Sequence, residues 1–277
     1  MTLQTALQQG ADILEKAGIT APRLTAEVLL CHALRRERAY LYAHAADELT
    51  TNTWIHFGRY LNERLNGKPT QYITKRQEFY GRNFLVTPDV LIPRPETEHL
   101  VEAAISVIRR DTRATILDVG TGSGAIALSI ALETGRRVLG CDISPSALRI
   151  AMENRERHRA PVSFFLGDLT TAVRPGSLDL LVSNPPYVPG VDHANMQREV
   201  RDWEPHVALF AGDCGLEVYQ RLIAGASLAV KPGGTLMMEL GFQSLAGVEG
   251  MLAPDWIDVR VIHDLAGWPR VIVAQRA

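Results

Sequence analysis

The spacing of hydrophobic residues changes once along the chain. Up to about residue 75 apolar residues recur at intervals of three and four, as in LTAEVLLCHAL (24–34) and TWIHFGRYLNERL (53–65), which predicts amphipathic helices. Beyond residue 96, short apolar runs alternate with longer helical patterns. Strands that alternate with helices predict parallel βαβ units in a doubly wound sheet.

A segment rich in aromatic and β-branched residues joins the two patterns. It reads EFYGRNFLVTPDVLIPRP (78–95), and its glycine and prolines between apolar runs predict a short hairpin. We therefore expect a small all-helical domain at 1–76, a β-hairpin linker at 77–93 and an α/β domain at 94–277.

The individual elements of the α/β domain can also be predicted. Ser144 and Pro145 suit the N-cap and first position of a helix, and KPGG (231–234) is expected to end another helix. The predicted strands are 114–119, 137–143, 162–167, 178–183, 235–240, 257–262 and 270–275, and the predicted helices are 97–109, 124–133, 146–158, 215–230 and one between 240 and 257.

Composition excludes several classes of protein. With 46% hydrophobic and 22% charged residues in 277, the chain has the make-up of an ordinary globular protein, and its net charge of -2 argues against a duplex-DNA binder. The three cysteines and eight histidines form no metal-ligand pattern, so we expect no metal site and a reducing compartment. The N-terminal residues carry Asp12 and Glu15 and lack an apolar core of signal-peptide length, and no run reaches the roughly 18 apolar residues of a membrane span. We expect a cytoplasmic protein that neither enters a membrane nor takes nucleic acid as its substrate.

A glycine-rich turn stands between a predicted strand and a predicted helix, in ILDVGTGSGAIALSIA (116–131). A tight turn that needs positive φ explains one glycine well but three alternating glycines poorly, so we expect a ligand near the backbone of Gly120, Gly122 and Gly124. The spacing differs from the G-x-G-x-x-G of dinucleotide folds. No Walker lysine follows, which disfavours phosphate binding.

Acidic residues end the next two predicted strands. Asp142 could accept hydrogen bonds from both hydroxyls of a ribose, and Asp168 could accept one from an adenine amino group, although either could be only a cap. The loop SNPPY (183–187) ends the fourth strand. Open α/β sheets bind ligands at the carboxyl ends of their strands, so these groups are expected to share one site.

The loop after the fourth strand predicts a rigid group of hydrogen-bond acceptors. Pro185 and Pro186 have fixed φ and no N–H, and Asn184 adds a side-chain carbonyl and is held extended before proline. A plain turn that ends a buried strand is the alternative. Such a cluster suits an NH2 group.

The arrangement resembles the class I S-adenosylmethionine (SAM) methyltransferases. The resemblance implies a Rossmann-like fold in which the loop Gly120–Gly124, including Thr121 and Ser123, lies against the methionine part of SAM. It also implies that Asp142 holds the ribose and that Asp168 and Leu169 lie at the adenine. Some relatives carry a tryptophan where Leu169 stands here, so stacking is weaker. The product would be S-adenosyl-L-homocysteine.

In methyltransferases with an NPPY loop the acceptor is a planar NH2 of adenine, cytosine or glutamine. By this resemblance the Asn184 side-chain oxygen and the Pro185 carbonyl would bind the two hydrogens and direct the lone pair at the methyl carbon. Tyr187 would stack on the planar group, Asn184 would also border the cofactor, and Pro186 would line the acceptor site. Positioning at roughly 3–3.5 Å would supply much of the rate.

Motifs along nearly the whole chain resemble the PrmC/HemK family, which methylates N5 of a glutamine in class 1 peptide chain release factors. They are GKPTQYI (67–73), VLIPRPETE (90–98), SNPPYV (183–188) and WEPHVALFAGDCGLEVY (203–219). The family implies that the helical domain docks the release factor and that the glutamine of its Gly-Gly-Gln motif enters the pocket. Lys75 stands near the place of a usual glycine. Residues 94–98 would start a helix or contact the site, and Glu204 with Pro205 would shape the wall of the acceptor pocket.

Other functions compete with this one. A methyltransferase for a glutamine of ribosomal protein L3 or for DNA adenine would share the chemistry, and the near-neutral charge counts against DNA. A nicotinamide dehydrogenase is disfavoured by the glycine spacing and by NPPY. A catalytically silent SAM-binding partner of the translation machinery is disfavoured because NPPY is intact.

Overall fold

The computed structural model describes residues 1–108 and 114–277, and the chain forms two compact units. The first unit comprises Met1–Arg76 together with Gln197–Trp203. The second comprises Gln77–Met196 and Glu204–Ala277. No helix among the described residues has both the length and the apolar character that crossing a bilayer requires.

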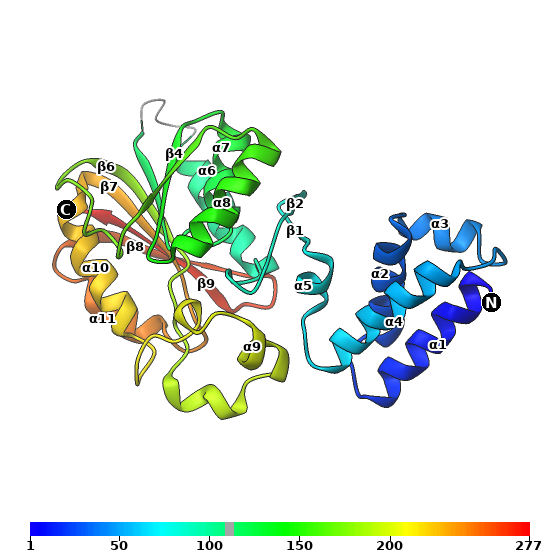
Figure 1. Ribbon diagram of the computed structural model, residues 1–277. Coiled ribbons are helices and arrows are strands. Elements are labelled where there is room, and N and C mark those ends of the chain that lie inside the picture. Colours follow the sequence, from blue (N-terminus) through cyan, green and yellow to red (C-terminus); the bar gives the residue numbers. More distant parts are fainter. Residues whose placement is uncertain (109–113) are drawn as a thin grey trace. The chain divides into compact units, whose positions relative to one another are not determined.

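The first unit is helical (Figure 1). Leu14, Leu29 and Phe57 form part of its closed apolar core. Thr2 and Thr50 accept hydrogen bonds from the backbone N–H groups of Thr5 and Thr53 and so cap two of its helices, as expected of threonine at an N-cap. The helices are α1 (Leu3–Lys16), α2 (Pro22–Leu34), α3 (Arg38–Ala43), α4 (Thr51–Leu65), α5 (Thr70–Thr74) and α9 (Arg198–Trp203).

Helix α9 belongs to the first unit although its sequence lies within the second. The buried Arg64 guanidinium pairs with Glu199 at 2.6 Å, and Arg198 donates to the Asn66 carbonyl at 3.3 Å. The Lys68 ammonium lies 5.6 Å from the Trp203 ring centroid, within cation–π range. The sequence pattern did not predict that residues 197–203 would join the first unit. A helix of six residues has too few turns to display a periodicity.

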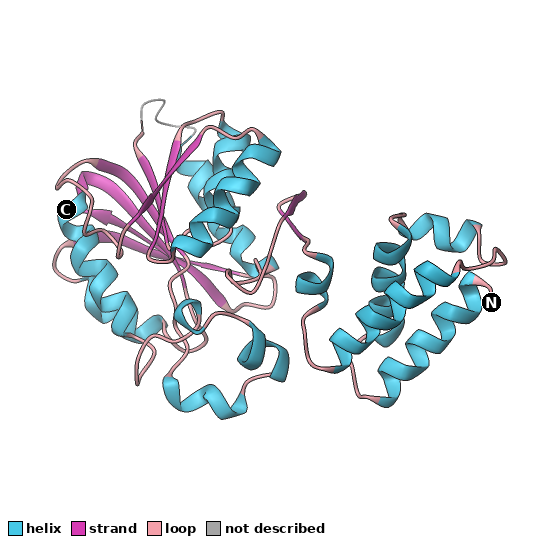
Figure 2. Cartoon of the chain, in the orientation of Figure 1, coloured by secondary structure: helices cyan, strands magenta, loops and turns pink. Residues whose placement is uncertain are grey.

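The second unit is built on a seven-stranded sheet in the order β5-β4-β3-β6-β7-β9-β8 (Figure 2). Its first five strands in that order are mutually parallel, as the sequence predicts. The strands are β3 (Ile116–Val119), β4 (Val138–Asp142), β5 (Val162–Leu166), β6 (Leu178–Ser183), β7 (Val230–Glu239), β8 (Trp256–His263) and β9 (Pro269–Arg276).

The last strand does not continue the parallel pattern, which corrects the expectation of parallel units throughout. β9 runs antiparallel to both β7 and β8. A short turn, closed by the hydrogen bond from Asp264 N to the Trp268 carbonyl at 2.9 Å, joins β8 directly to β9. Strands joined by a short turn pair antiparallel, since a parallel crossover needs a dozen residues or more.

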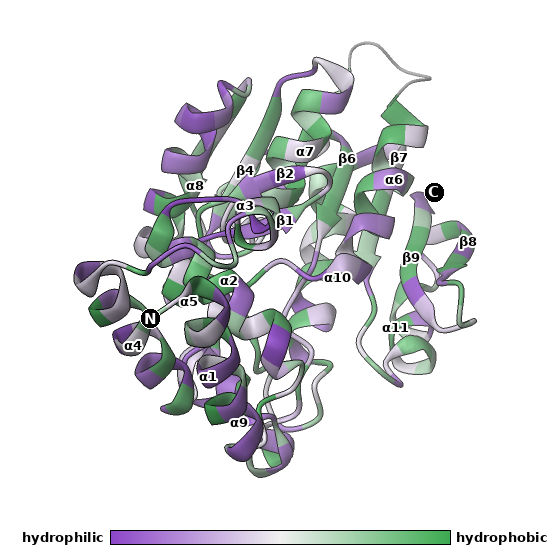
Figure 3. Ribbon diagram, turned by 90° about the vertical axis from the view of Figure 1, so that its right-hand side faces the viewer, coloured by the Kyte–Doolittle hydropathy of each residue, from purple (hydrophilic) through white to green (hydrophobic). Residues whose placement is uncertain are grey.

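Helices cover both faces of the sheet (Figures 1 and 2). Successive residues of a strand point to opposite faces, so Leu180 and Val182 of β6 join one core and Leu181 joins the other. Figure 3 shows hydrophobic residues along β6 and β7 and many hydrophilic residues on α8. The helices of one face are α6 (Glu98–Ile108), α7 (Ala125–Thr134) and α8 (Pro145–His158), and those of the other are α10 (Glu217–Ala229) and α11 (Leu245–Leu252).

The predicted hairpin is present as β1 (Gln77–Phe79) and β2 (Arg82–Phe84). Its turn residues Tyr80 and Gly81 both have positive φ, 50° and 67°, which suits a two-residue hairpin turn. Asn154 of α8, an amide with no solvent exposure, receives the Leu85 N–H at 2.7 Å and donates to the carbonyls of Leu85 and Ser123. This single side chain therefore joins the linker to the glycine-rich turn.

Two helix boundaries bear on the predictions. Ser144 caps α8, since its hydroxyl accepts the Ala147 N–H at 3.2 Å and Pro145 follows at the first position, which confirms that prediction. Helix α10 ends at Ala229, and KPGG lies within β7, where the register opposite Leu178 and Leu180 shifts. The last residue predicted for α6, Arg109, lies outside the described residues.

Truncation of a central strand residue tests the two-sided core. Leu181 is fully buried in β6, so Leu181→Ala is expected to lower the free energy of unfolding by about 2–5 kcal/mol through lost burial and a residual cavity. Leu228→Ala, at a leucine of α10 that is 68% exposed, serves as the control and is expected to change it by less than about 0.5 kcal/mol. Urea denaturation followed by circular dichroism measures both, and equal losses would contradict the assignment of the core.

Candidate active site

The register of the parallel strands brings the predicted site residues to one edge of the sheet. Val119 of β3 pairs with Ser183 of β6, and Ser183 pairs with Met238 of β7. The Ser183 hydroxyl donates to the Val119 carbonyl at 2.8 Å and links the two strand ends. The next residue of each strand, Gly120, Asn184 and Glu239, therefore emerges at the same edge.

The glycine-rich loop combines an open part with a packed part. All three glycines have positive φ, +70° at Gly120, +55° at Gly122 and +81° at Gly124, so the turn alone accounts for each of them and the expectation that it explains only one is wrong. A Cβ on Gly120 would meet no atom within 4 Å, whereas one on Gly124 would lie 3.0 Å from Leu128 and 3.2 Å from Phe164. The Cβ side of Gly120 is therefore open to a ligand, whereas that side of Gly124 is filled by Leu128 and Phe164.

The fully buried residue Asp118 stabilises the glycine-rich loop through hydrogen bonds. Its carboxylate accepts the Thr121 hydroxyl at 2.6 Å and the Ala127 N–H at 3.2 Å. Desolvation by burial raises the pKa of Asp118 to about 7, against the lowering effect of those hydrogen bonds. The sequence analysis gave this residue no role, although an acid inside the apolar run ILDV was a signal.

Asp142, at the end of β4, is joined to the loop and to α8. One carboxylate oxygen accepts the Gly122 N–H at 2.8 Å and the other accepts the Ser144 N–H at 2.9 Å. Desolvation raises the pKa of Asp142, and the bonds from Ser144 and Gly122 oppose the rise. Each carboxylate oxygen has a second lone-pair position, so the side chain can still accept from a ligand hydroxyl.

Asp168 and Leu169 follow β5. The Asp168 carboxylate pairs with the Arg221 guanidinium of α10 at 2.5 Å, and both side chains are exposed to solvent, where an ion pair contributes little stability. Leu169 has a φ of 51°, uncommon for a residue with a side chain, and its carbonyl accepts the thiol of the buried Cys141 at 3.4 Å. The pair thus lies beside the ends of β4 and β5.

The acceptor loop, residues 183–190, is supported by a second segment. Val188 donates to the Leu209 carbonyl at 2.9 Å and accepts the Ala211 N–H at 3.0 Å, and Gly190 donates to the Gly212 carbonyl at 2.8 Å. Residues 209–212 belong to the sequence WEPHVALFAGDCGLEVY (203–219). This pairing explains why the two motifs occur together.

Glu217 holds the end of the supporting segment. Its carboxylate accepts the N–H groups of Cys214 and Leu216 at 2.9 and 3.0 Å. The backbone hydrogen bond from Cys214 is the main reason that the pKa of Glu217 falls to about 2. The side chain is therefore ionised across the physiological range and holds the turn that leads into α10.

Tyr187 packs tightly within the loop. A Cβ on Gly241 would come within 2.6 Å of the Tyr187 ring, and one on Gly215 would come within 2.6 Å of its carbonyl oxygen. Burial raises the pKa of Tyr187 to about 12, so the phenol stays neutral. Gly241 thus makes room for the ring, and Gly215 makes room for the Tyr187 backbone.

Asn184 meets Thr97, which belongs to the segment 94–98 predicted to start a helix or contact the site, and Glu239, which the sequence did not single out. Its amide nitrogen donates to the Thr97 hydroxyl oxygen at 3.2 Å, and Thr97 is a buried residue of the short helix η1 (Pro95–Thr97). The buried carboxyl group of Glu239 interacts with the side chains of both Thr97 and Asn184. Desolvation raises the pKa of Glu239 to about 7, and hydrogen bonding from the Thr97 and Asn184 side chains lowers it in part.

The segments containing Arg94 and Glu204 are joined by an ion pair. Arg94 and Glu204 lie 2.5 Å apart, and the Glu204 side chain is only 2% exposed. Residues 95–97 form η1, which leads into α6, so the motif IPRPETE (92–98) starts a helix. The pair accounts for the presence of Glu204 beside Pro205 without a catalytic step.

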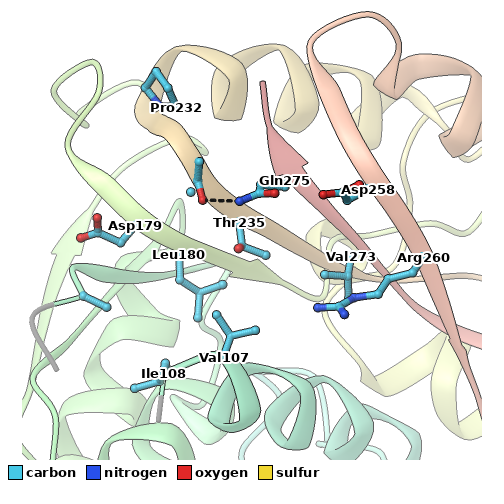
Figure 4. Close-up of a pocket in the computed structure, with 13 residues that line it drawn as sticks. Val107, Ile108, Asp179, Leu180, Pro232, Thr235, Asp258, Arg260, Val273 and Gln275 are labelled. Atoms are coloured by element: carbon cyan, nitrogen blue, oxygen red, sulfur yellow. Dashed lines mark hydrogen bonds between the residues drawn. The ribbon is translucent and has the colours of Figure 1, made fainter. Parts of the chain in front are cut away.

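A separate cavity of about 590 Å³ lies at the opposite edge of the sheet (Figure 4). Asp179, Thr235 and Gln275 are among its lining residues. The Asp179 carboxylate is occupied by Lys231 at 2.7 Å and by the Thr115 N–H at 2.7 Å, and Gln275 donates to the Gly233 carbonyl at 3.0 Å. These polar groups stabilise the amino ends of β6 and β7.

Comparison with known proteins identifies the family. The PrmC N-terminal domain family matches residues 5–74, and the methyltransferase small domain family matches residues 98–201. The release factor glutamine methyltransferase of Koribacter versatilis is 45% identical over 100% of this chain and 99% of its own length. That of Bacillus subtilis is 37% identical over 99% of this chain and 97% of its own length.

The chain belongs to the release factor glutamine methyltransferase family. Solved structures agree with the fold of this family. The hMettl16 catalytic domain gives a TM-score of 0.59 at 17% identity, covering 78% of this chain and 81% of that one. The 16S rRNA N2 G1207 methyltransferase of T. thermophilus, solved with AdoMet and guanosine, gives 0.53 at 18% identity, covering 73% and 50%. A class I methyltransferase fold is therefore confirmed.

The buried acid below the glycine loop makes a testable contribution to pH-dependent stability. Because the folded pKa of Asp118 is raised from 3.8 to about 7, its contribution is complete below the unfolded pKa and is lost as pH rises through the folded pKa. Asp118→Asn keeps an acceptor oxygen for Thr121 and Ala127 but has no proton to lose. The melting temperature of this variant relative to the unmodified protein is expected to rise between pH 4 and pH 8.

Thermal denaturation at several pH values in that range measures the difference. Asp179→Asn is the control, because the Lys231 and Thr115 bonds lower the pKa of that carboxyl below 3.8. It is ionised in the folded and the unfolded state above about pH 4, so the melting temperature of this variant relative to the unmodified protein is expected to stay nearly constant across the range. A difference between Asp118→Asn and the unmodified protein that does not vary with pH would show that Asp118 titrates normally.

Proposed function

We propose that this protein transfers a methyl group from SAM to the side-chain amide nitrogen, N5, of the glutamine in the Gly-Gly-Gln motif of class 1 peptide chain release factors. The observation that carries the proposal is the orientation of Asn184. Its NH2 is directed to Thr97, which leaves its carbonyl oxygen for an acceptor amide. The names of the full-length relatives supply the substrate class.

The residues at the edge of the sheet fit SAM. The open backbone at Gly120, with Thr121, Gly122 and Ser123 beyond it, suits the methionine part, while Asp142 would accept from the ribose hydroxyls. Asp168 and Leu169 would lie at the adenine. Bound SAM supplies an electrophilic methyl group on a sulfonium, and S-adenosyl-L-homocysteine is the product.

The loop then acts on the acceptor. An amide nitrogen is a poor nucleophile because its lone pair is delocalised into the carbonyl. The Asn184 oxygen and the Pro185 carbonyl would accept its two hydrogens, point the lone pair at the methyl carbon and stabilise the positive charge that develops on nitrogen. Pro186 supplies no competing N–H, and Tyr187 would stack on the amide plane. The proton released after transfer passes to water.

The helical first unit would dock the release factor, as the PrmC N-terminal match at residues 5–74 suggests. A protein acceptor agrees with the near-neutral charge of -2. We propose a cytoplasmic location, where release factors act and where the free thiols of Cys31, Cys141 and Cys214 would stay reduced.

Transfer of a labelled methyl group from SAM to purified acceptors tests the proposal. Label is expected on a class 1 release factor but not on the same factor with its Gly-Gly-Gln glutamine changed to alanine, because that amide is the only group the site is proposed to take. Duplex DNA and ribosomal protein L3 are the comparison acceptors. Label on either of them in place of the release factor would overturn the substrate assignment.

Two substitutions separate the acceptor role from the cofactor role. Asn184→Ala removes the acceptor oxygen and is expected to lower kcat at least about 100-fold, as loss of one fixed dipole at the reacting group does, while SAM binding is retained. Asp142→Ala is expected to weaken SAM binding first. Calorimetric titration with SAM and initial rates measure both effects. Loss of SAM binding in the first variant, or unchanged affinity in the second, would contradict these roles.

A further inference from the structure

We infer that Thr97 and Glu239 are positioning residues that hold the Asn184 side chain with its carbonyl oxygen toward the acceptor amide. The inference rests on the proposed function, since it assigns a task to residues next to the proposed acceptor group. Thr97 lies in the segment 94–98 that the sequence predicts to start a helix or contact the site, whereas Glu239 did not stand out in the sequence.

The backbone of Glu239 is firmly placed beside Asn184. Ser183 pairs with Met238 across β6 and β7, so the following residues, Asn184 and Glu239, are neighbours. On its other side Glu239 pairs with Val271 of β9. Its carbonyl accepts the Tyr219 hydroxyl at 2.7 Å. A strand end held from both sides gives the carboxyl group little freedom to move away from Asn184.

The carboxyl group is buried more deeply than its hydrogen bonds explain. Glu239 is 4% exposed, and its Oε2 atom has no hydrogen-bond partner within the described residues. Burying a carboxyl group without full hydrogen bonding costs free energy. A glutamine or leucine would fill the same space at less cost, so the acid is better explained by its effect on its neighbours than by packing.

Thr97 lies between the amide and the carboxyl group. Its hydroxyl oxygen accepts from the Asn184 nitrogen at 3.2 Å, which leaves the hydroxyl hydrogen to donate. The Thr97 side chain lowers the pKa of Glu239 by hydrogen bonding, as the Asn184 side chain also does. Donors therefore point in one direction, from the amide NH2 through the hydroxyl to the carboxylate.

This direction decides which way the amide faces. An ionised carboxylate is only an acceptor, so it draws the Thr97 hydrogen and the Asn184 NH2 toward itself. The carbonyl oxygen of Asn184 must then face the opposite way. If Asn184 turned over, its oxygen would meet the carboxylate and its NH2 would meet the NH2 of the acceptor. The charge of Glu239 thus selects the productive rotamer.

Other ionisable groups face the Glu239 carboxyl from the surrounding elements. Glu96 of η1 raises its pKa, and Arg270 of β9 lowers it. Tyr187 of the acceptor loop and Tyr219 of α10 also interact with its charge, and burial keeps the pKa of each phenol at about 12 or above. Neither tyrosine titrates near neutral pH. Asp118 under the glycine-rich loop does, with a pKa of about 7, so a change of rate near pH 7 is assigned to Glu239 by comparison with a variant in which this carboxyl group is replaced.

The test compares four variants of the protein, one of them a control, with a class 1 release factor as acceptor. Thr97→Val keeps the shape of the side chain but removes the hydroxyl, and Thr97→Ser restores the hydroxyl. We expect Thr97→Val to lower kcat about 10- to 100-fold, the equivalent of one lost buried hydrogen bond, with the affinity for SAM unchanged. Thr97→Ser is expected to recover most of the rate.

Glu239→Gln provides the readout that a merely structural role would not move. Because the ionised form orients Asn184 and the pKa of Glu239 is about 7, kcat of the unmodified protein is expected to fall as pH drops below about 7. In Glu239→Gln this acid limb disappears and kcat is low throughout.

Thr134→Val is the matched control for Thr97→Val, because it removes a hydroxyl that bonds the Ile130 carbonyl at the far end of α7. Its kcat is expected to be unchanged.

The outcomes separate this inference from the proposed function. An unmodified protein that does not methylate the release factor would overturn the proposed function. Methylation by the unmodified protein together with full kcat in Thr97→Val, or with an acid limb retained in Glu239→Gln, would overturn only the positioning roles. Loss of rate in Thr97→Ser equal to that in Thr97→Val would do the same, and melting temperatures of all variants exclude unfolding as the cause.

Discussion

The parallel pairing of β6 between β3 and β7 is the constraint on which the site depends. Val119, Ser183 and Met238 stand in one line across the three strands, and a shift of one residue would turn every side chain to the other face of the sheet. Leu180, Leu181 and Val182 are buried on alternating faces, so apolar burial opposes any such shift. The energy of the core therefore fixes the positions of Gly120, Asn184 and Glu239.

Burial of acidic groups is the electrostatic counterpart of this constraint. Asp118, Asp142 and Glu239 all have raised pKa values, with desolvation as the first cause. Backbone N–H groups, hydroxyls and an amide partly satisfy these carboxyl groups. A site of this kind has a fixed set of dipoles that need not reorganise when charge develops on a substrate. Burial of apolar side chains on both faces of the sheet offsets the free-energy cost of burying these acids.

Backbone hydrogen bonds connect the acceptor loop to the segment 203–219, although the two are separated along the chain. Residues 188–190 pair with residues 209–212, and Glu217 caps the end of that segment. Between them the chain contributes α9 to the first unit. The acceptor loop is therefore followed along the chain by a helix of the unit that is proposed to dock the release factor.

Local pattern was sufficient to predict the helical first part, the hairpin, the parallel strands β3 to β7 and the cap at Ser144, because periodicity and turn residues act over a few residues. The methyltransferase family followed from the resemblance of motifs along the chain. It did not predict that β9 would insert antiparallel between β7 and β8, nor that α9 would join the first unit. It gave no role to Asp118, Asn154 and Glu239, and it left open whether Thr97 and its neighbours contact the site. Their roles arise from partners far away in sequence; Thr97 and Asn184, for example, are 87 positions apart. Only packing of the whole sheet determines which of these distant groups meet, since burial and register are properties of the folded chain.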